Sequence, residues 1–275
     1  MSIQFNALNF GLLKNIILAI VLGAIAAVLS RRLKFLTKGG SRAAFLLAVP
    51  VFGLGGWKWG VPLLYFFLSS SILSKLRKKY NSEVDASFEK TGVRDQYQVF
   101  SNGGLGGILV IMDYFMNSGL FYLAYIGMLA AVCADTWGTE IGTLTRTKTY
   151  NVLNLHAVEQ GTSGGISVPG TLGALAGALS VAISSAVWIN TGLILYFCII
   201  ILAGFSGSLI DSILGTTLQS AFYCTKCGKL TEKKFHCAWP AVHKKGFLWI
   251  GNDVVNLAAG MSGGVFAIIF RNILR

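Results

Sequence analysis

The sequence predicts an all-α, polytopic transmembrane helical bundle, and three observations support this fold class. Hydrophobic residues make up 54% of the 275 residues, charged residues make up only 12%, and the mean hydropathy is +0.64. Soluble domains carry about 25% charged residues. The charges are also segregated, since residues 166–210 contain none. A backbone in hydrocarbon must form helices or a closed barrel, and these runs lack the alternation of barrel strands.

The hydrophobic runs predict about seven to eight spans in a single integral membrane domain of residues 1–275. The first run should be retained as a helix, because Arg31 and Arg32 follow it where a signal peptide would be cleaved. Two runs, 43–56 and 103–116, are shorter than the ~20 residues that cross a bilayer, so tilted, broken or re-entrant helices are expected there. The expected spans are 10–30, 43–56, 59–76, 103–116, 119–136, 167–187, 193–213 and 252–270.

The basic residues predict the orientation of these spans. If the spans alternate, 19 of the 23 Lys and Arg residues fall in segments 31–42, 75–102, 137–166 and 214–251. Cytoplasmic loops of membrane proteins carry such an excess. We therefore expect these segments, and any active site formed by them, to face the cytoplasm, with both termini on the other side. The net charge of +12 mostly reflects this bias, and no motif indicates a nucleic-acid partner.

Four of the 11 acidic residues lie where spans meet the cytoplasmic edge: Asp135, Glu140, Asp211 and Asp253. An ionisable group near hydrocarbon is costly and usually serves a site, a partner or a cavity. One such acid could simply reach the interface or cap a helix, as Asp253 could do. Four acids on one face favour a catalytic site, in which Asp135, Glu140 and Asp211 are candidate Mg²⁺ ligands.

A glycine-rich segment precedes the sixth span. Such turns let backbone N–H groups approach an anion, and a helix N-terminus adds its positive dipole. The alternative is a flexible connection in which Thr162 or Ser163 only caps the helix. Beside clustered carboxylates, the segment predicts a phosphate-binding turn. Its candidate binding residues are Gly161, Thr162, Ser163, Gly164, Gly165 and Ser167.

Segment 94–104 supplies a cation and two amides. Arg94, Gln98 and Asn102 recur at every fourth position, which would place them on one helical face. Arg94 could bind a phosphate, or it could pair with Asp95 or Glu89. The basic run that includes Arg77 is interpreted as a topology determinant.

In these motifs the sequence resembles the integral membrane family, once classed as a domain of unknown function, that includes transmembrane protein 19 and the plant phytyl-phosphate kinases. The resemblance implies a kinase that converts a prenyl monophosphate to the diphosphate with a nucleoside triphosphate. It also implies that Asn252 and Asn256 contact substrate. The matching stretches, in order, are Arg94-Asp-Gln-Tyr-Gln-Val-Phe-Ser-Asn-Gly-Gly, Ala134-Asp-Thr-Trp-Gly-Thr-Glu-Ile-Gly, Gly161-Thr-Ser-Gly-Gly-Ile-Ser with Gly170-Thr, Asp211-Ser-Ile-Leu-Gly-Thr-Thr-Leu-Gln, and Gly251-Asn-Asp-Val-Val-Asn.

A cytoplasmic Cys/His loop is expected at about residues 219–249. Cys224, Cys227, His236 and Cys237 are four candidate ligands for a structural Zn²⁺, which takes such sets with tetrahedral geometry. Adjacent His236 and Cys237 would not easily both bind one ion, so His243 is a competing fourth ligand. Free thiols are the alternative, because a disulfide is disfavoured in the reducing cytoplasm.

Together, these patterns and the resemblance predict a membrane kinase acting on a phytyl-type prenyl phosphate, with CTP as the expected nucleotide and Mg²⁺ as cofactor. The prenyl tail would lie between helices, in contact with the lipid bilayer. The alternative is a membrane transporter or lipid flippase, which short broken spans would support. Asp113 is the only acid expected away from the cytoplasmic edge, however, and a translocation path would need polar groups deeper in the membrane.

Overall fold

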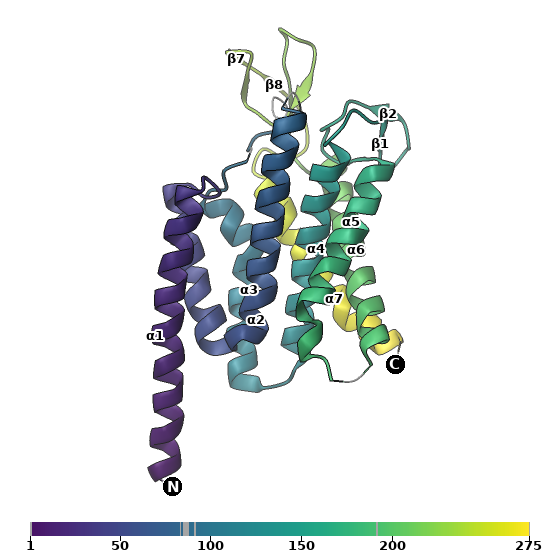
Figure 1. Cartoon of the computed structure of the whole chain (residues 1–275). Helices are drawn as coiled ribbons and strands as arrows, with labels where there is room; N and C mark the ends of the chain where they lie inside the picture. Colours follow the sequence, from purple (N-terminus) through teal and green to yellow (C-terminus); the bar gives the residue numbers. More distant parts are fainter. Residues whose placement is uncertain (1, 83, 85–87, 91, 191, 275) are drawn as a thin grey trace.

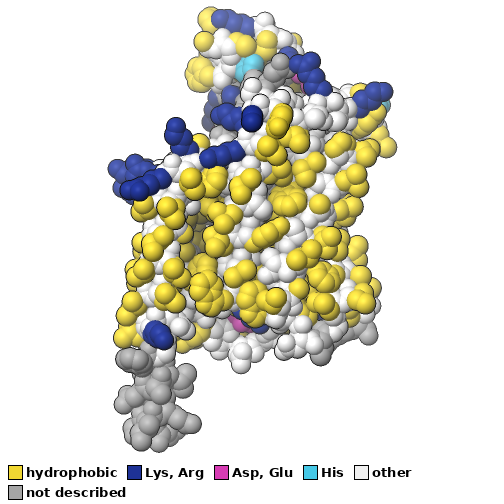
Figure 2. All heavy atoms as spheres, in the orientation of Figure 1, with side chains coloured by type: hydrophobic (Ala, Val, Ile, Leu, Met, Phe, Trp, Pro, Cys, Tyr) yellow, Lys and Arg dark blue, Asp and Glu magenta, His cyan; other side chains and the backbone are white. Residues whose placement is uncertain are grey.

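The computed structural model describes residues 2–82, 84, 88–90, 92–190 and 192–274. It confirms the all-α membrane class, because seven helices of the described chain are long and apolar enough to cross a bilayer. On the face shown in Figure 2, hydrophobic side chains are spread over the whole height of the helices. The helices are α1 (Ser2–Arg32), α2 (Lys38–Tyr80), α3 (Gln96–Met116), α4 (Leu120–Gly142), α5 (Val168–Ser185), α6 (Leu193–Thr217) and α7 (Asn252–Ile273), with a short 3₁₀ turn at Ala186–Trp188 after α5.

Helix α2 reverses direction at Gly56, so that its two arms run side by side (Figure 1). Gly56 has φ of 63° and ψ of −157°, a conformation that a side chain would disfavour. Both arms of α2 contact the same residue: Arg94 O accepts a hydrogen bond from Thr37 N, at the start of the first arm, and the Arg94 guanidinium donates one to Ser71 Oγ, within the second. The first arm, residues 38–55, is about 27 Å long at 1.5 Å per residue. The two expected spans 43–56 and 59–76 are therefore the arms of one broken helix.

The expected short span 103–116 was wrong at its start, because α3 begins at Gln96 and is 21 residues long. Asp95 caps this helix: its Oδ1 accepts from Gln98 N at 2.9 Å, and Gln98 Oε1 accepts from Asp95 N at 3.2 Å. This reciprocal pair is a capping box. Arg94 precedes the cap, so it does not share a helical face with Gln98 and Asn102 as predicted.

Helix α4 forms the centre of the bundle. Of its most apolar stretch, 67% is buried, against 11% for the peripheral α1. Small residues permit the neighbouring helices to approach closely: a Cβ added at Gly177 of α5 or Gly204 of α6 would press against Cys133 or Ala130 of α4. Membrane helix interfaces favour small residues because lipid supplies no hydrophobic driving force. This packed helix holds Asp135 in a fixed position.

Short antiparallel strands occupy the loops at one end of the bundle, which we call the loop end (Figure 1). Most of the Lys and Arg side chains visible in Figure 2 gather there. Between α4 and α5 lie β1 (Thr149–Asn151), β2 (Ala157–Val158) and β3 (Gly165–Ile166), in the order β2-β1-β3. Between α6 and α7 lie β4 (Ala221–Tyr223), β5 (Leu230–Thr231) and β8 (Val242–Lys245), in the order β5-β4-β8, and a hairpin of β6 (Phe235–His236) with β7 (Trp239–Pro240).

Candidate active site

A cavity of about 210 Å³ lies at the loop end, where α4 and α6 end and α3, α5 and α7 begin. Three of the four predicted acids line it: Asp135, Glu140 and Asp211. Every residue that was predicted to bind substrate or nucleotide also lines it. These residues are Arg94, Gln98, Asn102, Gly161, Thr162, Ser163, Gly164, Gly165, Ser167, Asn252 and Asn256.

Asp135 of α4 and Asp211 of α6 form a carboxylate pair in the cavity, with side chains close enough to interact directly. Asp211 Oδ2 is buried and has no hydrogen-bond partner among the described residues. A buried polar atom without a partner is costly unless an ion or a donor satisfies it. Carboxylate oxygens are the ligands that Mg²⁺ prefers in proteins. The pair therefore fits the predicted magnesium site.

Glu140, the third predicted magnesium ligand, is bound by protein groups instead. Its Oε2 pairs with Arg77 Nε at 2.8 Å, and its Oε1 accepts a hydrogen bond from Ser74 Oγ at 2.6 Å. The Arg77 and Glu140 side chains are only 3% and 11% exposed. Among the described residues, Glu140 and the two aspartates do not form a group that could hold one metal ion together. Glu140 is thus the ion-pair partner of Arg77. Arg77 also lines the cavity, so its role is not limited to setting the orientation of the helices, as the sequence had suggested.

Asp253, the fourth predicted acid, lies outside the cavity lining and forms an ion pair with Lys90. Lys90 also pairs with Asp95, at 2.9 Å, and it lines the cavity itself. Burial lowers the pKa of Lys90, but its bonds to Asp253 and Asp95 outweigh burial, so its pKa is raised overall. Lys90 therefore stays charged and holds the start of α7 to the cap of α3. Asp253 acts in this structure as a positioning residue.

The glycine-rich turn forms one wall of the cavity. Gly164 has φ of 78°, and a Cβ added there would collide with Thr216 and Ser212 of α6. Ser163 Oγ donates to Gln219 Oε1 at 2.8 Å, which ties the turn to the end of α6. The N-cap of α5 is Ser167, whose Oγ accepts from Gly170 N, and neither Thr162 nor Ser163 takes that role. The first turns of α5 and α7 line the same cavity, so both helix dipoles favour an anion there.

Arg94 lines the same cavity as the carboxylates. It donates to Ser71 Oγ at 3.2 Å and lies against the rings of Phe66 and Phe67, at 5.8 and 5.9 Å from their centroids. Within the described chain, no carboxylate is in ion-pair distance of Arg94, and Asp95 pairs with Lys90 instead. Burial lowers the pKa of Arg94, but a guanidinium keeps its proton at neutral pH. The cation is therefore ready for an anionic ligand.

A second, apolar groove of about 100 Å³ runs between α1, both arms of α2, and α3. Residues such as Ala27 of α1, Ala44 of α2 and Val99 of α3 line it. Arg94, Gln98 and Asn102 line both the groove and the polar cavity. These three residues therefore mark the junction of a charged compartment with a hydrocarbon-like one.

Sequence reasoning missed Lys90 and Glu232 in the cavity lining. Glu232 Oε1 accepts from Gln219 Nε2 at 2.8 Å, and its Oε2 accepts from Glu89 N at 3.1 Å. Its burial raises the pKa of Glu232. No local signal singled out either residue, because each also binds a residue far away in the sequence: Asp253 lies 163 residues after Lys90, and Glu89 lies 143 residues before Glu232.

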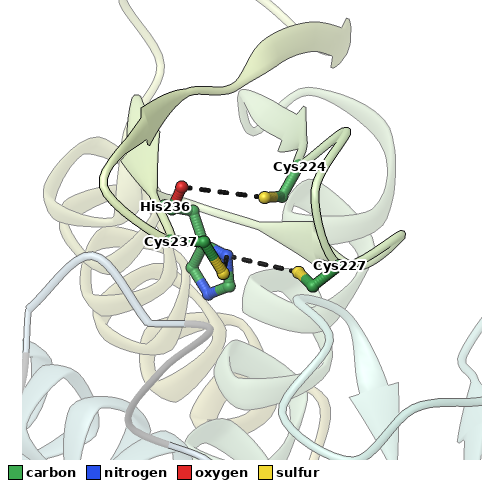
Figure 3. Close-up of side chains that lie close together, drawn as sticks. All are labelled: Cys224, Cys227, His236 and Cys237. Carbon is green, nitrogen blue, oxygen red and sulfur yellow. Dashed lines mark hydrogen bonds between the residues drawn. The ribbon is translucent and has the colours of Figure 1, made fainter.

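The predicted zinc ligands Cys224, Cys227, His236 and Cys237 come together at the loop end, with one ligand atom from each within 4.8 Å of the others (Figure 3). His243, the competing ligand, lies apart from them in β8 against the ring of Phe222.

Comparisons with known proteins agree with this picture. Protein PGR of Arabidopsis thaliana is 30% identical over 243 residues, covering 80% of this chain and 84% of its own length. Protein VTE6, chloroplastic, of the same plant is 24% identical over 87% of this chain and 66% of its own length. A membrane protein of Synechocystis is 26% identical over 96% of this chain and 92% of its own length. No solved structure matches. The family described as integral membrane protein DUF92 matches residues 21–264, and the chain belongs to this family, as the sequence motifs predicted.

Proposed function

We propose that this protein is a membrane kinase that converts a prenyl monophosphate to the prenyl diphosphate, with a nucleoside triphosphate as donor and CTP as the first donor to test. The observation that carries this proposal is the junction at Arg94, Gln98 and Asn102, where an apolar groove meets a polar cavity. A ligand that fills both compartments has an apolar tail and an anionic head. A prenyl phosphate has this form, and the resemblance of the sequence motifs to the plant phytyl-phosphate kinases supports the same substrate class.

The groove suits a flexible hydrocarbon chain. Its walls come from three helices that face lipid, so the tail can stay at the depth of the bilayer while its phosphate reaches the cavity. At the junction, Arg94 carries a charge that lacks a carboxylate partner in the described chain and is held in place by Ser71. Arg94 is then the residue that binds and orients the prenyl phosphate, since guanidinium and phosphate form paired charge-assisted hydrogen bonds.

The rest of the cavity suits a nucleoside triphosphate. Its phosphates would meet the glycine-rich turn at Gly164 and the N-termini of α5 and α7. Asp135 and Asp211 would hold Mg²⁺, which when bound offsets the negative charge of the phosphates. An oxygen of the prenyl phosphate attacks the terminal phosphorus, and the bond from that phosphorus to the bridging oxygen breaks. The products are the prenyl diphosphate and the nucleoside diphosphate.

The chemistry requires positioning more than covalent help from the protein. Phosphoryl transfer between two phosphates proceeds through alignment and charge stabilisation, so no nucleophilic side chain is needed. Two sets of ion pairs fix the relative positions of the helices around the cavity: Arg77 with Glu140, and Lys90 with Asp253 and Asp95. The transporter alternative would use acids deeper in the bundle, but Asp113 accepts a hydrogen bond from Gly119 N at the turn after α3.

A substrate panel tests the proposal. Purified protein in lipid nanodiscs, with Mg²⁺, is offered prenyl monophosphates of several lengths with CTP, ATP, GTP or UTP, and diphosphate formation is followed by mass spectrometry. We expect turnover with at least one pair and none with the matching prenyl alcohol. If no pair gives a diphosphate, while prenyl phosphate crosses the bilayer of proteoliposomes, the protein is a flippase and the kinase proposal is refuted.

The tail position has its own test. Ala27→Phe adds a ring to the groove wall, so the variant should lose long prenyl substrates and retain short ones. Ala24→Phe is the matched control, because Ala24 is exposed on the same helix and lies outside the groove. Equal chain-length preference in both variants would place the tail elsewhere.

A further inference from the structure

We propose that Cys224, Cys227, His236 and Cys237 form a structural Zn²⁺ site at the loop end, and that this site stabilises the wall of the active-site cavity. Each residue offers a ligand atom, and these atoms lie within 4.8 Å of one another (Figure 3). His236 Nδ1 is 3.4 Å from Cys227 Sγ and 3.3 Å from Cys237 Sγ. With Zn–S of about 2.3 Å and Zn–N of about 2.0 Å, tetrahedral geometry sets such N–S edges at about 3.5 Å. The two N–S distances from His236 thus fit the edges of one zinc site, and the fourth ligand, Cys224, lies within the same small cluster.

The β6–β7 hairpin explains how two adjacent residues can face one ion. Its two-residue turn, Cys237-Ala238, has φ of 52° and 56°, so both residues are left-handed as in a type I′ turn. Such turns strongly favour Asn and Gly, and left-handed backbone is strained for other residues. The turn brings the Cys237 sulfur to the same side as the His236 ring. The structure thus brings together the ligand atoms of two neighbours that were not expected to bind one ion easily, and metal binding would offset the strain of the turn.

The other candidate ligands are placed elsewhere. His243 pairs with Phe222 across the β4–β8 ladder, and its ring packs on the Phe222 ring at 5.6 Å. Cys133 is buried in α4, and Cys198 lies in α6. Binding releases three thiol protons to solvent, and a Cys₃His site then carries a net charge of −1. Six lysines of the same loop balance that charge: Lys226, Lys229, Lys233, Lys234, Lys244 and Lys245.

The zinc site is linked to the cavity through one acid. Strand β5 follows the Cys224–Cys227 turn and leads directly to Glu232, which lines the cavity. One Glu232 oxygen accepts from Glu89 N, next to Lys90, and the other accepts from Gln219. Gln219 in turn accepts from Ser163 of the glycine-rich turn. Zinc would therefore fix the loop that joins two parts of the cavity wall, the segment at Lys90 and the glycine-rich turn.

Metal analysis of the purified full-length chain tests the site. We expect about one zinc per chain, and Co²⁺ substitution should give the intense thiolate-to-cobalt absorption of a tetrahedral site. Cys227→Ser should remove the zinc. His243→Gln and Cys198→Ser are matched controls that should keep it, because both residues lie outside the cluster.

A second measurement covers the case in which Cys227→Ser does not fold. Chelation of the wild-type chain should lower its Tm and speed hydrogen exchange in the 161–165 turn, and added Zn²⁺ should reverse both changes. The proposal is overturned if wild-type protein takes up no Zn²⁺ or Co²⁺, or if His243→Gln loses the metal. A metal site whose removal leaves exchange at 161–165 unchanged would overturn the link to the cavity. None of these readouts depends on kinase activity.

Discussion

Replacing Arg94 tests the junction at which the two compartments meet. Arg94→Gln keeps a polar side chain of similar length but removes the charge that faces the substrate phosphate. A hydrogen bond to a charged group contributes about 1.5–3 kcal/mol. Since about 1.36 kcal/mol corresponds to a tenfold change in rate, kcat/KM should fall about 10- to 150-fold. The Arg94 side chain is held by Ser71 and two phenylalanine rings, so little of the fall in kcat/KM should come from rearrangement of the surrounding side chains.

The assay is the kinase reaction with the best substrate pair from the panel, measured over a range of prenyl phosphate concentrations. Arg94→Lys keeps the charge without the planar fork and should fall between the wild type and Arg94→Gln. Arg42→Gln is the matched control, because Arg42 is exposed on α2 and should be silent. The Tm of Arg94→Gln should not drop, since the change removes a partly buried cation that lacks an acidic partner among the described residues. Wild-type kcat/KM in Arg94→Gln would refute the assignment.

Three further predictions concern the acids and the orientation. Asp135→Asn should keep the fold and lower turnover by about 10²- to 10⁴-fold, as for loss of a charge-stabilising group, whereas Asp113→Asn should be nearly silent; the reverse order would favour a transporter. Glu140→Gln should lower the free energy of unfolding by about 3–5 kcal/mol because it breaks a buried ion pair with Arg77 Nε, and adding Arg77→Met should recover much of the loss in Tm. If the double variant is no more stable than Glu140→Gln, the ion pair is not the cause. A single cysteine at the turn 117–119 should be labelled from outside intact cells and one in the loop 219–249 should not; the opposite pattern would reverse the predicted orientation.

The membrane class could be predicted from the sequence because it depends on local composition. Long uncharged runs must be helical in lipid, whatever their neighbours, and the basic loops mark one end of the bundle. The cavity lining could be predicted for a related reason. Polar residues that flank membrane spans must lie at one end of the bundle or the other, because the hydrocarbon excludes them. Asp135, Asp211 and the glycine-rich turn therefore meet at the same end.

Helix ends were less predictable, because caps and breaks are decided by single residues in context. The capping box at Asp95 starts α3 earlier than its hydrophobic run does. Gly56 joins two short runs into one broken helix, and hydropathy alone cannot tell this reversal from two separate helices.

The sequence by itself determined which residues lie at the membrane edge, since that depends only on the chain nearby. Only the tertiary structure decided what each of them does there, because partners are chosen across the bundle. Glu140 appeared equivalent to Asp135, yet Arg77, 63 residues away, binds its carboxylate. Arg94 appeared to have an acid beside it, yet Lys90 pairs with Asp95 and leaves the guanidinium at the junction of the two compartments. Charged residues that are far apart in the sequence form ion pairs only after packing has brought their helices together.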